Sequence, residues 1–210
     1  MKIGVIGSGT VGQTLAKGFS LAGHDVRIGS REGNKLAEFS AATGLAEGTF
    51  ADVAAFADVV ILAVRGDVAE AVVKELAGSL AGKPVLDTTN PISGSPKDGI
   101  LPYFTGANES LIERLQRAAP DAKLVKFFNS VGAGLMLQPK LAGGTPTMFT
   151  CGNDAGAKAT ATALSKELGW NVEDVGTAAA GHPVEALCQI WCAPGFQRND
   201  WAHAYAVLRP

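Results

Sequence analysis

The stretch Ile3-Gly4-Val5-Ile6-Gly7-Ser8-Gly9-Thr10-Val11-Gly12 decides the fold of this chain. It places the pattern G-x-G-x-x-G directly after an apolar run and before residues with helical spacing, which is the context in which the pattern binds a dinucleotide. Gly7 permits a tight turn, Gly9 lets a pyrophosphate approach the backbone, and Gly12 lets the helix pack closely on the strand. The phosphates would lie at the helix N-terminus, where free N–H groups favour negative charge.

The residues at the end of the second predicted strand indicate which dinucleotide is bound. An NAD site usually carries Asp or Glu about 20 residues after the glycines, where the carboxylate bonds the ribose 2′-hydroxyl. Here that place holds Ser30 and Arg31. A carboxylate would repel a 2′-phosphate, whereas a hydroxyl and a guanidinium would bind it. The sequence therefore predicts a site for NADP(H).

The composition is that of a soluble α/β protein with tight turns, since 47% of the 210 residues are hydrophobic, 18% are charged and 26 are glycine. A net charge of −2 without a basic run argues against nucleic acid or an anionic membrane surface as partner. We expect no membrane span, because no apolar run is long enough, and no signal peptide, because the chain opens with a predicted strand.

Three cysteines, Cys151, Cys188 and Cys192, fit the reduced thiols of a cytoplasmic protein. Cys188 and Cys192 share one helix face, but no His or acidic residue nearby completes a metal site. We therefore expect a cytoplasmic location and no bound metal.

Strands and helices are predicted to alternate along almost the whole chain. Strands are expected at about 2–6, 24–29, 57–64, 84–87, 124–128, 147–151 and 171–175, and helices at about 11–22, 33–43, 67–80, 110–120, 154–168 and 183–193. The apolar run at 57–64 is typical of a parallel strand covered on both faces. This alternation predicts a doubly wound, mainly parallel Rossmann sheet, extended beyond the strand order 3-2-1-4-5-6.

Several helix ends carry local signals. Asp67-x-x-Glu70 and Ser110-x-x-Glu113 resemble capping boxes, and Pro183 is expected at the first position of a helix. Val184, Leu187, Ile190 and Trp191 would face inward from that helix, which Ala193-Pro194-Gly195 would end before a last short helix runs to about Leu208. We expect one NADP-binding Rossmann-type domain over 1–210, in which 178–210 is a small helical C-terminal extension.

Ligands of an open α/β sheet lie beyond the carboxyl ends of its strands. The segments expected at that edge are 7–12, 63–65, 88–91 and 129–132. Ala63 and Val64 would cover the path from adenosine to nicotinamide. Thr89 and Asn90 offer polar groups near the nicotinamide, and Asn129 is a second candidate for positioning the nicotinamide or the acceptor.

The sequence contains no convincing acid–base set. His182, next to Pro183, could approach the nicotinamide pocket as a proton donor, whereas His24 lies at the other sheet edge and His203 near the terminus. Ser110, Lys126 and Asp87 have no partners that form a catalytic triad. This fits a hydride passing directly between two bound cofactors, which the protein mainly orients.

Five motifs occur here in an order that resembles the coenzyme F420-dependent NADP oxidoreductase family, whose relatives include the cytoplasmic domain of membrane ferric reductases. They are Gly7–Gly12, Gly23-His24-Asp25-Val26 leading to Gly29-Ser30-Arg31, Asp58–Val64, Asp87-Thr88-Thr89-Asn90-Pro91 and Val125-Lys126-Phe127-Phe128-Asn129. The resemblance covers nearly the whole chain. It implies an NADP(H)-dependent reductase whose second substrate, a deazaflavin such as F420 or a flavin-like acceptor, stacks on the nicotinamide.

The resemblance also implies roles for single residues. Ser8, Thr10 and Val11 would line the pyrophosphate. The 2′-phosphate would be held by Ser30, Arg31 and Lys35, and the nicotinamide end flanked by Ala63, Val64 and Asn90.

Two segments depart from the family pattern and are expected to shape the pocket of the second substrate: the loop 92–106, with Lys97, Pro102, Tyr103 and Phe104, and the tail 192–201. Two alternatives stay open. One is a reductase of a small carbonyl or imine, although such enzymes carry a long C-terminal helical domain that we do not expect here. The other is a non-catalytic NADP-binding redox sensor. The expected partner is a small-molecule acceptor, and a homodimer is a further open alternative.

Overall fold

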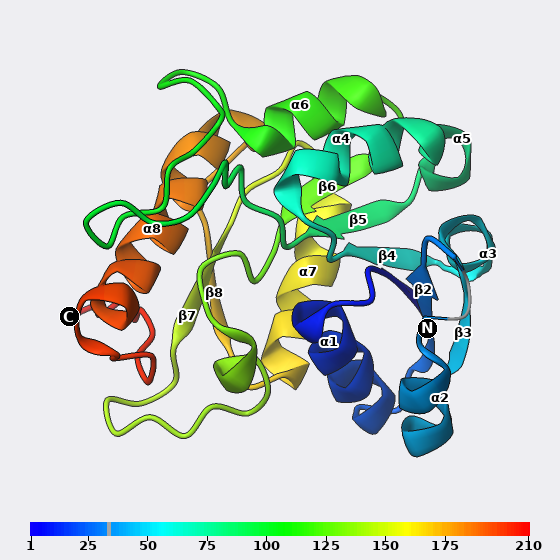
Figure 1. Cartoon of the computed structure of the whole chain (residues 1–210), viewed down its shortest axis with the longest axis horizontal. Coiled ribbons are helices and arrows are strands. Elements are labelled where there is room, and N and C mark those ends of the chain that lie inside the picture. The colour runs from blue at the N-terminus through cyan, green and yellow to red at the C-terminus, as the bar shows by residue number, and fades with distance from the viewer. Residues whose placement is uncertain (33–34) are drawn as a thin grey trace.

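A six-stranded parallel sheet forms the centre of the computed structural model, which describes residues 1–32 and 35–210 (Figure 1). The strand order is β3-β2-β1-β4-β5-β6. The strands are β1 (Lys2–Ile6), β2 (Asp25–Ser30), β3 (Ala46–Thr49), β4 (Val59–Leu62), β5 (Pro84–Asp87) and β6 (Lys123–Lys126). The predicted Rossmann-type α/β class is thus confirmed.

The register brings the carboxyl ends of five strands to one edge. Ile6 pairs with Gly29 on one side and with Leu62 on the other. Leu62 pairs in turn with Asp87, and Asp87 with Lys126. The loops that follow these residues therefore emerge side by side, as the sequence predicted.

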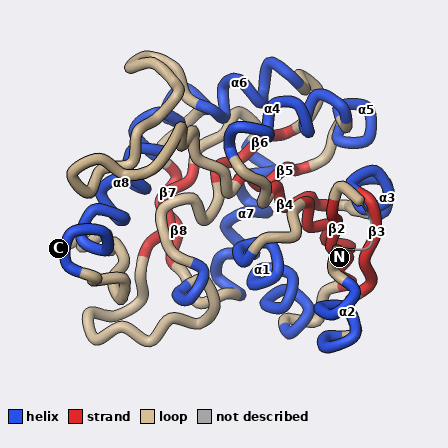
Figure 2. The backbone as a smooth tube through the Cα atoms, in the orientation of Figure 1, coloured by secondary structure: helices blue, strands red, loops and turns tan. Residues whose placement is uncertain are grey.

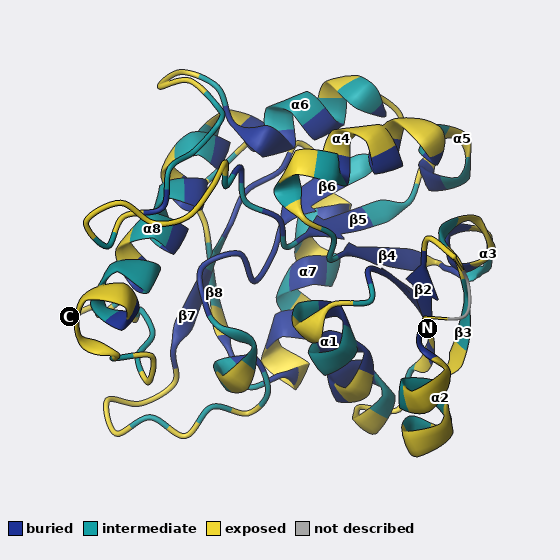
Figure 3. Cartoon of the chain, in the orientation of Figure 1, coloured by how far each residue is buried: buried dark blue, intermediate teal, exposed yellow. Residues whose placement is uncertain are grey.

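Helices cover both faces of the sheet, because successive side chains of a strand point to opposite faces. Val59 and Ile61 of β4 belong to the core beneath α1 (Thr10–Leu21) and α7 (Ala155–Glu167). Val60 and Leu62 belong to the core on the other face. That face is covered by α3 (Phe50–Phe56), α4 (Gly66–Glu75), α5 (Ala77–Leu80) and α6 (Leu111–Ala118). Figure 3 shows the resulting band of buried strands between the two helical layers.

A second, two-stranded parallel sheet contains β7 (Thr147–Thr150) and β8 (Asn171–Asp174), joined through α7. The expected extension of the main sheet is therefore wrong. Directly after β7 the chain forms an isolated antiparallel bridge with β6, between Val125 and Gly152, and no further ladder between the two is described. A Cβ on Gly152 would lie 2.5 Å from the Leu124 carbonyl oxygen, so the chain crosses the sheet edge at a close approach instead of continuing the ladder.

The sequence reading missed β3 and α3. β3 reads Ala-Glu-Gly-Thr and lies at the sheet edge with no buried residue, so it lacks the apolar pattern of a strand. α3 follows at once, capped by a reciprocal Thr49–Asp52 box. The helix predicted over 33–43 is α2 (Ala37–Thr43), and the part of that prediction on Gly33 and Asn34 lies outside the described residues.

The two expected capping boxes have different outcomes. The Ser110–Glu113 box is confirmed at the start of α6. The Asp67–Glu70 box is wrong, because α4 begins at Gly66 after Arg65 and the Asp67 carboxylate binds the Arg65 side chain instead. The expected single helix over 67–80 is also divided, at Leu76, into α4 and α5.

The C-terminal part contains one long helix, α8 (Gly181–Arg198), which follows a single 3₁₀ turn, η2 (Ala178–Ala180). Pro183 occupies its third position, not the first, where its missing N–H is still harmless. Pro194 lies inside the helix, so the expected end at Ala193–Gly195 is wrong. Ile190 is 60% exposed, which contradicts its predicted inward position, whereas Val184 and Trp191 are buried.

The expected last helix to Leu208 is also wrong, since residues 199–210 contain no helix. This tail instead binds β7 and α8. The Thr147 amide donates to the Tyr205 carbonyl oxygen at 2.8 Å, and the Tyr205 hydroxyl donates to the Leu187 carbonyl oxygen at 2.8 Å. The tail 199–210 is therefore held by hydrogen bonds to β7 and α8 and not by hydrogen bonds within a helix of its own.

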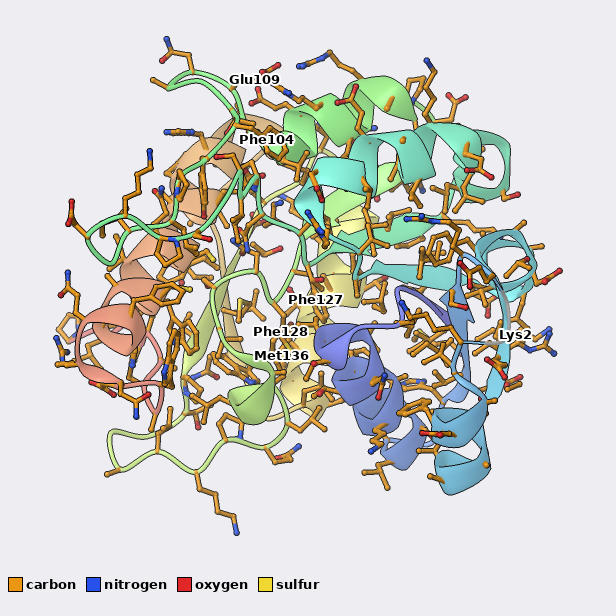
Figure 4. The ribbon with its side chains drawn as sticks, viewed as in Figure 1. Lys2, Phe104, Glu109, Phe127, Phe128 and Met136 are labelled. Carbon is orange, nitrogen blue, oxygen red and sulfur yellow. The ribbon has the colours of Figure 1, made fainter. Side chains whose placement is uncertain are left out.

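The chain leaving β6 is fixed by aromatic packing. Figure 4 shows Phe127 and Phe128 beside α1, with Met136 close by. Phe127 stacks on Phe19 of α1, and Phe128 meets Trp170 edge to face at a ring-centroid distance of 5.3 Å. The Trp170 indole N–H donates to the Met136 carbonyl oxygen at 3.1 Å. These contacts hold the backbone at the point where Asn129 follows.

Candidate functional site

The turn between β1 and α1 needs glycine at two positions for packing. Gly7 has φ +137°, and a Cβ there would lie 2.1 Å from the Ala63 carbonyl oxygen. A Cβ on Gly12 would lie 2.1 Å from the Gly7 carbonyl oxygen. At Gly9, by contrast, an added Cβ meets no atom within 4 Å. Gly7 and Gly12 thus close the turn on the sheet, while Gly9 faces open space.

That open space lies at the N-terminus of α1. Gly9 is the residue before the helix, and no acidic residue occupies the first turn. The first N–H groups of a helix have no acceptor within it, so they are available to an anion. The Gln13 side-chain amide donates to the Ser8 carbonyl oxygen at 2.9 Å and fixes the turn from behind.

A cavity of about 680 Å³ begins at this turn and extends along the ends of β4 and β5. It is lined by Gly9, Thr10, Val11, Ala63, Val64, Arg65, Gly66, Asp67, Thr88, Thr89, Asn90, Ile92, Ser93, Gly94 and Ser95. We call it the Asn90 cavity.

A second cavity of about 350 Å³, here called the Arg31 cavity, lies at the end of β2. Its lining includes Gly7, Ser8, Arg31, Glu32 and Lys35. The two cavities share Gly9, Ala63, Val64 and Arg65, so they adjoin one another along the end of β4.

This arrangement fits a dinucleotide with a 2′-phosphate. Three cations, Arg31, Lys35 and Arg65, and one carboxylate, Glu32, line the Arg31 cavity, and a helix N-terminus without acidic residues in its first turn lies where the two cavities meet. Of the other residues proposed from the sequence, Gly12 lies beneath the turn. Ser30 is buried at the end of β2, adjacent to Arg31, and has interactions of its own.

Asn90 and Asn129 are brought together as a pair. The Asn90 side-chain amide donates to the Asn129 carbonyl oxygen at 2.7 Å. The Asn129 side-chain amide donates to the Asn90 Oδ1 at 3.0 Å and to the Val184 carbonyl oxygen at 3.0 Å. Asn90 lines the cavity and Asn129 does not, so Asn129 adjoins the cavity through its hydrogen bonds to Asn90.

The backbone before Asn129 is strained. Phe128 has φ +46°, which is uncommon for a bulky residue. The aromatic contacts of Phe128 hold it in this conformation, and the resulting turn directs the chain from β6 toward Asn90. Such strain is often found beside functional sites.

A buried ion network, which sequence reasoning missed, lies beneath the turn that carries Asn90. Lys126 Nζ is 2.6 Å from Asp87 Oδ2 and 2.9 Å from Glu185 Oε1, and all three side chains are almost fully buried. Lys126 also donates to the Thr89 carbonyl oxygen, and the Thr89 amide and hydroxyl both donate to Asp87 Oδ1. The network thus fixes the residue before Asn90.

The charge of Lys126 is maintained by its two partners. Burial alone would lower the pKa of Lys126, but the Asp87 and Glu185 carboxylates outweigh burial and raise its pKa above the ordinary value. Glu185 also accepts from the Leu111 and Ile112 amides at the start of α6. The network connects β5, β6, α6 and α8, and we assign it a structural role.

The remaining candidates lie away from both cavities. His182 lines neither of them, and its Nδ1 is buried without a partner in the described residues. Burial raises the pKa of the Cys151 thiol to about 12, so this thiol is neutral. Cys188 and Cys192 have their sulfur atoms 3.9 Å apart. In residues 1–32 and 35–210, no group of three or more His, Cys, Asp or Glu residues could hold a metal.

Of the two segments expected to shape the pocket of the second substrate, only the start of the 92–106 loop lines the Asn90 cavity. The lining of the Asn90 cavity includes Ile92–Ser95 from the start of the 92–106 loop, but not the four residues singled out in that loop, Lys97, Pro102, Tyr103 and Phe104, and nothing from the tail 192–201. In Figure 2 the whole segment between β5 and α6 is loop. Arg65 lies in the segment 63–65 that was predicted at this edge, whereas Asp67 was missed as a lining residue. Its position shortly after the apolar strand β4 is the signal that could have found it.

Known proteins share this fold. Residues 2–91 match the model of a family described as NADP oxidoreductase, coenzyme F420-dependent. The solved structure of a candidate F420-dependent NADP reductase from Arthrobacter sp. FB24 has a TM-score of 0.92 and 34% identity, with 100% of both chains covered. This chain belongs to the coenzyme F420-dependent NADP oxidoreductase family.

Membership of this family of NADP-dependent oxidoreductases confirms the resemblance seen in the motifs. Metalloreductase STEAP3 of Rattus norvegicus is 29% identical over 186 residues, which are 89% of this chain and 36% of the relative. The F420-dependent NADP reductase of Methanothermobacter thermautotrophicus is 30% identical over 152 residues, which are 66% of this chain and 65% of the relative. The chain therefore spans less than two thirds of either curated relative. No helix in the described part of the chain is long and apolar enough to cross a membrane.

Proposed function

We propose that this chain binds NADP(H) across the two adjoining cavities and transfers a hydride between the nicotinamide and a deazaflavin (F420) or flavin-like acceptor. The observation that carries the proposal is that Arg31 and Lys35 share a cavity with the glycine-rich turn, and that this cavity adjoins the one lined by Asn90. Arg31 and Lys35, with Ser30 behind them, hold the 2′-phosphate. The amides of Thr10, Val11 and the rest of the first turn of α1 bind the pyrophosphate.

Asn90 orients the nicotinamide end. One N–H of its side-chain amide and its Oδ1 are already bonded to Asn129, so their directions are set before a ligand arrives. A side-chain amide has two N–H donors, which leaves one for the carboxamide or the ribose of the cofactor. When bound, NADPH supplies the hydride.

The Asn90 cavity favours direct transfer over acid–base chemistry. Among its described lining residues, the ionisable side chains are Arg65 and Asp67, which pair with each other. A reductase of a small carbonyl or imine needs a group that delivers a proton to the substrate. Hydride transfer to a ring stacked on the nicotinamide needs the protein mainly to hold both rings in place.

The acceptor is expected between Asn90 and the loop residues Ile92–Ser95, which line the same cavity. The small residues Ser93, Gly94 and Ser95 leave space there for a planar ring, and the two serine hydroxyl groups can bond its polar edge. A non-catalytic sensor would need no such space beside the nicotinamide.

The test is NADPH oxidation by the purified protein with F420, FMN, FAD and ferric chelates, together with the Kd of NADPH from calorimetry. Oxidation with F420 or a flavin supports the proposal. Tight NADPH binding without oxidation by any acceptor favours the sensor, and oxidation with only carbonyl or imine substrates would overturn the acceptor assignment. Absence of NADPH binding would reject the whole site.

We further propose that residues 1–210 act as one NADP-binding domain with 178–210 as its C-terminal extension, that the protein works in the cytoplasm, and that it forms a homodimer. Exposed Ile190 and Phe196 on α8 supply apolar surface for a second copy. Light scattering of the purified chain tests the dimer, and a monomeric mass at micromolar concentration would exclude it.

A further inference from the structure

Arg65 lies where the two cavities meet. It is the residue directly before α4, and its side chain lines both the Asn90 cavity and the Arg31 cavity. It shares this position with Gly9, Ala63 and Val64. None of these three carries a charge, so Arg65 is the cation at the boundary.

A dinucleotide that occupies both cavities has to cross this boundary with its pyrophosphate, because the pyrophosphate joins its two halves. The N-terminus of α1 approaches the boundary from one side through Gly9 and Thr10, and the N-terminus of α4 approaches it from the other through Arg65 and Gly66. Both helix ends favour negative charge there, and at α4 the Asp67 carboxylate of its first turn supplies that charge in the absence of a ligand.

The present partner of Arg65 is weakly held. Its Nε and Nη2 atoms lie 3.0 Å and 2.5 Å from the two carboxylate oxygens of Asp67. The two side chains are 83% and 41% exposed, so the ion pair contributes little net stability. A guanidinium makes the same paired hydrogen bonds to a phosphate as to a carboxylate. Exchange of Asp67 for a phosphate therefore costs little.

We propose that Arg65 is a further cofactor-binding residue, which turns its guanidinium from Asp67 to the pyrophosphate of the bound dinucleotide. The inference rests on the proposed function, in which the dinucleotide spans both cavities. In this proposal the two arginines have different roles. Arg31 binds the 2′-phosphate and sets the preference for NADP(H), whereas Arg65 binds the pyrophosphate, which NADP(H) and NAD(H) share.

The experiment measures by calorimetry the Kd of NADP⁺, NAD⁺ and 2′-AMP for the wild type, Arg65→Ala, Asp67→Asn and Arg31→Ala. Arg65→Ala should raise the Kd of NADP⁺ and of NAD⁺ by the same factor, roughly 10-fold for a charge-assisted hydrogen bond in an exposed position. It should leave 2′-AMP unchanged, because that ligand has no pyrophosphate. Arg31→Ala should give the opposite pattern, with loss of NADP⁺ and 2′-AMP affinity and no change for NAD⁺.

Asp67→Asn is the matched control, since it removes the competing carboxylate and keeps the side-chain size. It should bind both dinucleotides at least as tightly as the wild type. The inference is overturned if Arg65→Ala binds NADP⁺ normally, if it loses 2′-AMP as strongly as NADP⁺, or if Asp67→Asn weakens binding as much as Arg65→Ala does. A wild type that binds no nucleotide would instead reject the proposed function, and this inference with it. An unchanged melting temperature of the Arg65 variant shows that the fold is intact.

Discussion

Asn90 and Asn129 hold each other through two reciprocal hydrogen bonds, 2.7 Å from the Asn90 amide to the Asn129 carbonyl oxygen and 3.0 Å from the Asn129 amide to Asn90 Oδ1. The bonds join the turn after β5 to the turn after β6, 39 positions later. Both amide orientations are fixed by these partners, because the Asn129 amide also has the Val184 carbonyl as acceptor. The side chain facing the cavity is therefore ordered without a ligand.

Replacement of Asn90 should lower the hydride-transfer rate more than it weakens cofactor binding. A small misplacement of the reacting ring can cost about 100-fold in rate, so we expect a loss of roughly 10- to 100-fold in kcat for Asn90→Ala. Asn129→Asp keeps the shape but cannot donate to Asn90 Oδ1, and should give a smaller loss of the same kind. Steady-state kcat and KM for NADPH distinguish the cases. A change confined to KM would show that Asn90 binds the cofactor without orienting it, and near-normal kcat in Asn129→Asp would remove Asn129 from the site.

Removal of His182 should have little effect on turnover. The side chain lines neither cavity, whereas a general acid contributes about 100- to 10,000-fold to the rate. We expect less than a threefold change in kcat for His182→Ala with NADPH and a flavin-like acceptor. A thousandfold loss would contradict direct hydride transfer and favour the carbonyl or imine reductase.

Arg31 should set the choice of cofactor. Its guanidinium lies in the smaller cavity with Lys35, and no ion pair joins either residue to another described residue. A charge-assisted hydrogen bond contributes about 1.5–3 kcal/mol, so Arg31→Ala should weaken the binding of NADPH by roughly 10- to 150-fold. NADH binding should change little. Equal affinities of the wild type for the two cofactors, measured by fluorescence titration, would argue against the assignment.

Gly9 and Gly7 should respond in opposite ways to a side chain. Gly9→Val places its branches in open space, so the fold should survive while the pyrophosphate is excluded and NADPH binding is lost. Gly7→Ala is the contrasting control, because its Cβ would lie 2.1 Å from the Ala63 carbonyl oxygen at a φ of +137°. It should lower the melting temperature strongly. A well-folded Gly9→Val protein that still binds NADPH would remove this turn from the cofactor site.

The sequence predicts those parts of the fold that local pattern determines. β4 is an uninterrupted apolar run, and Ser110 with Glu113 forms the helix cap its spacing indicates. β3 could not be predicted from the sequence, because an edge strand with no buried residue needs no apolar pattern. The end of α8 was predicted wrongly, because a proline such as Pro194 normally stops a helix, whereas here the helix continues to Arg198.

The same distinction between local pattern and long-range contact decides which parts of the site could be predicted. The glycine-rich turn and Arg31 are local motifs, whereas the contact of Asn129 with Asn90 depends on the strand order. Asp67 pairs with Arg65 instead of forming the capping box that its spacing to Glu70 predicted. The ion network of Asp87, Lys126 and Glu185 joins three distant segments, and no spacing rule relates them.

That network supplies the last prediction, on stability. Loss of one partner leaves buried charges without compensation, so Lys126→Met should lower the free energy of unfolding by about 3–5 kcal/mol. Lys123→Met is the matched control in the same strand. Lys123 is 42% exposed and lies 3.5 Å from Asp154, so its loss should cost less than about 1 kcal/mol.

The effect should also depend on pH in a defined direction. Because the pKa of Lys126 is raised above its ordinary value of 10.5 in the folded protein, its contribution is fully present below that pH. It is lost as the pH rises from 10.5 through the raised pKa, because between these two values the unfolded chain releases the proton while the folded protein still holds it. Urea unfolding should therefore show a constant difference between wild type and Lys126→Met across the neutral range, and a narrowing difference above pH 10.5. Equal stability of the two proteins at neutral pH would mean that the two carboxylates do not depend on Lys126.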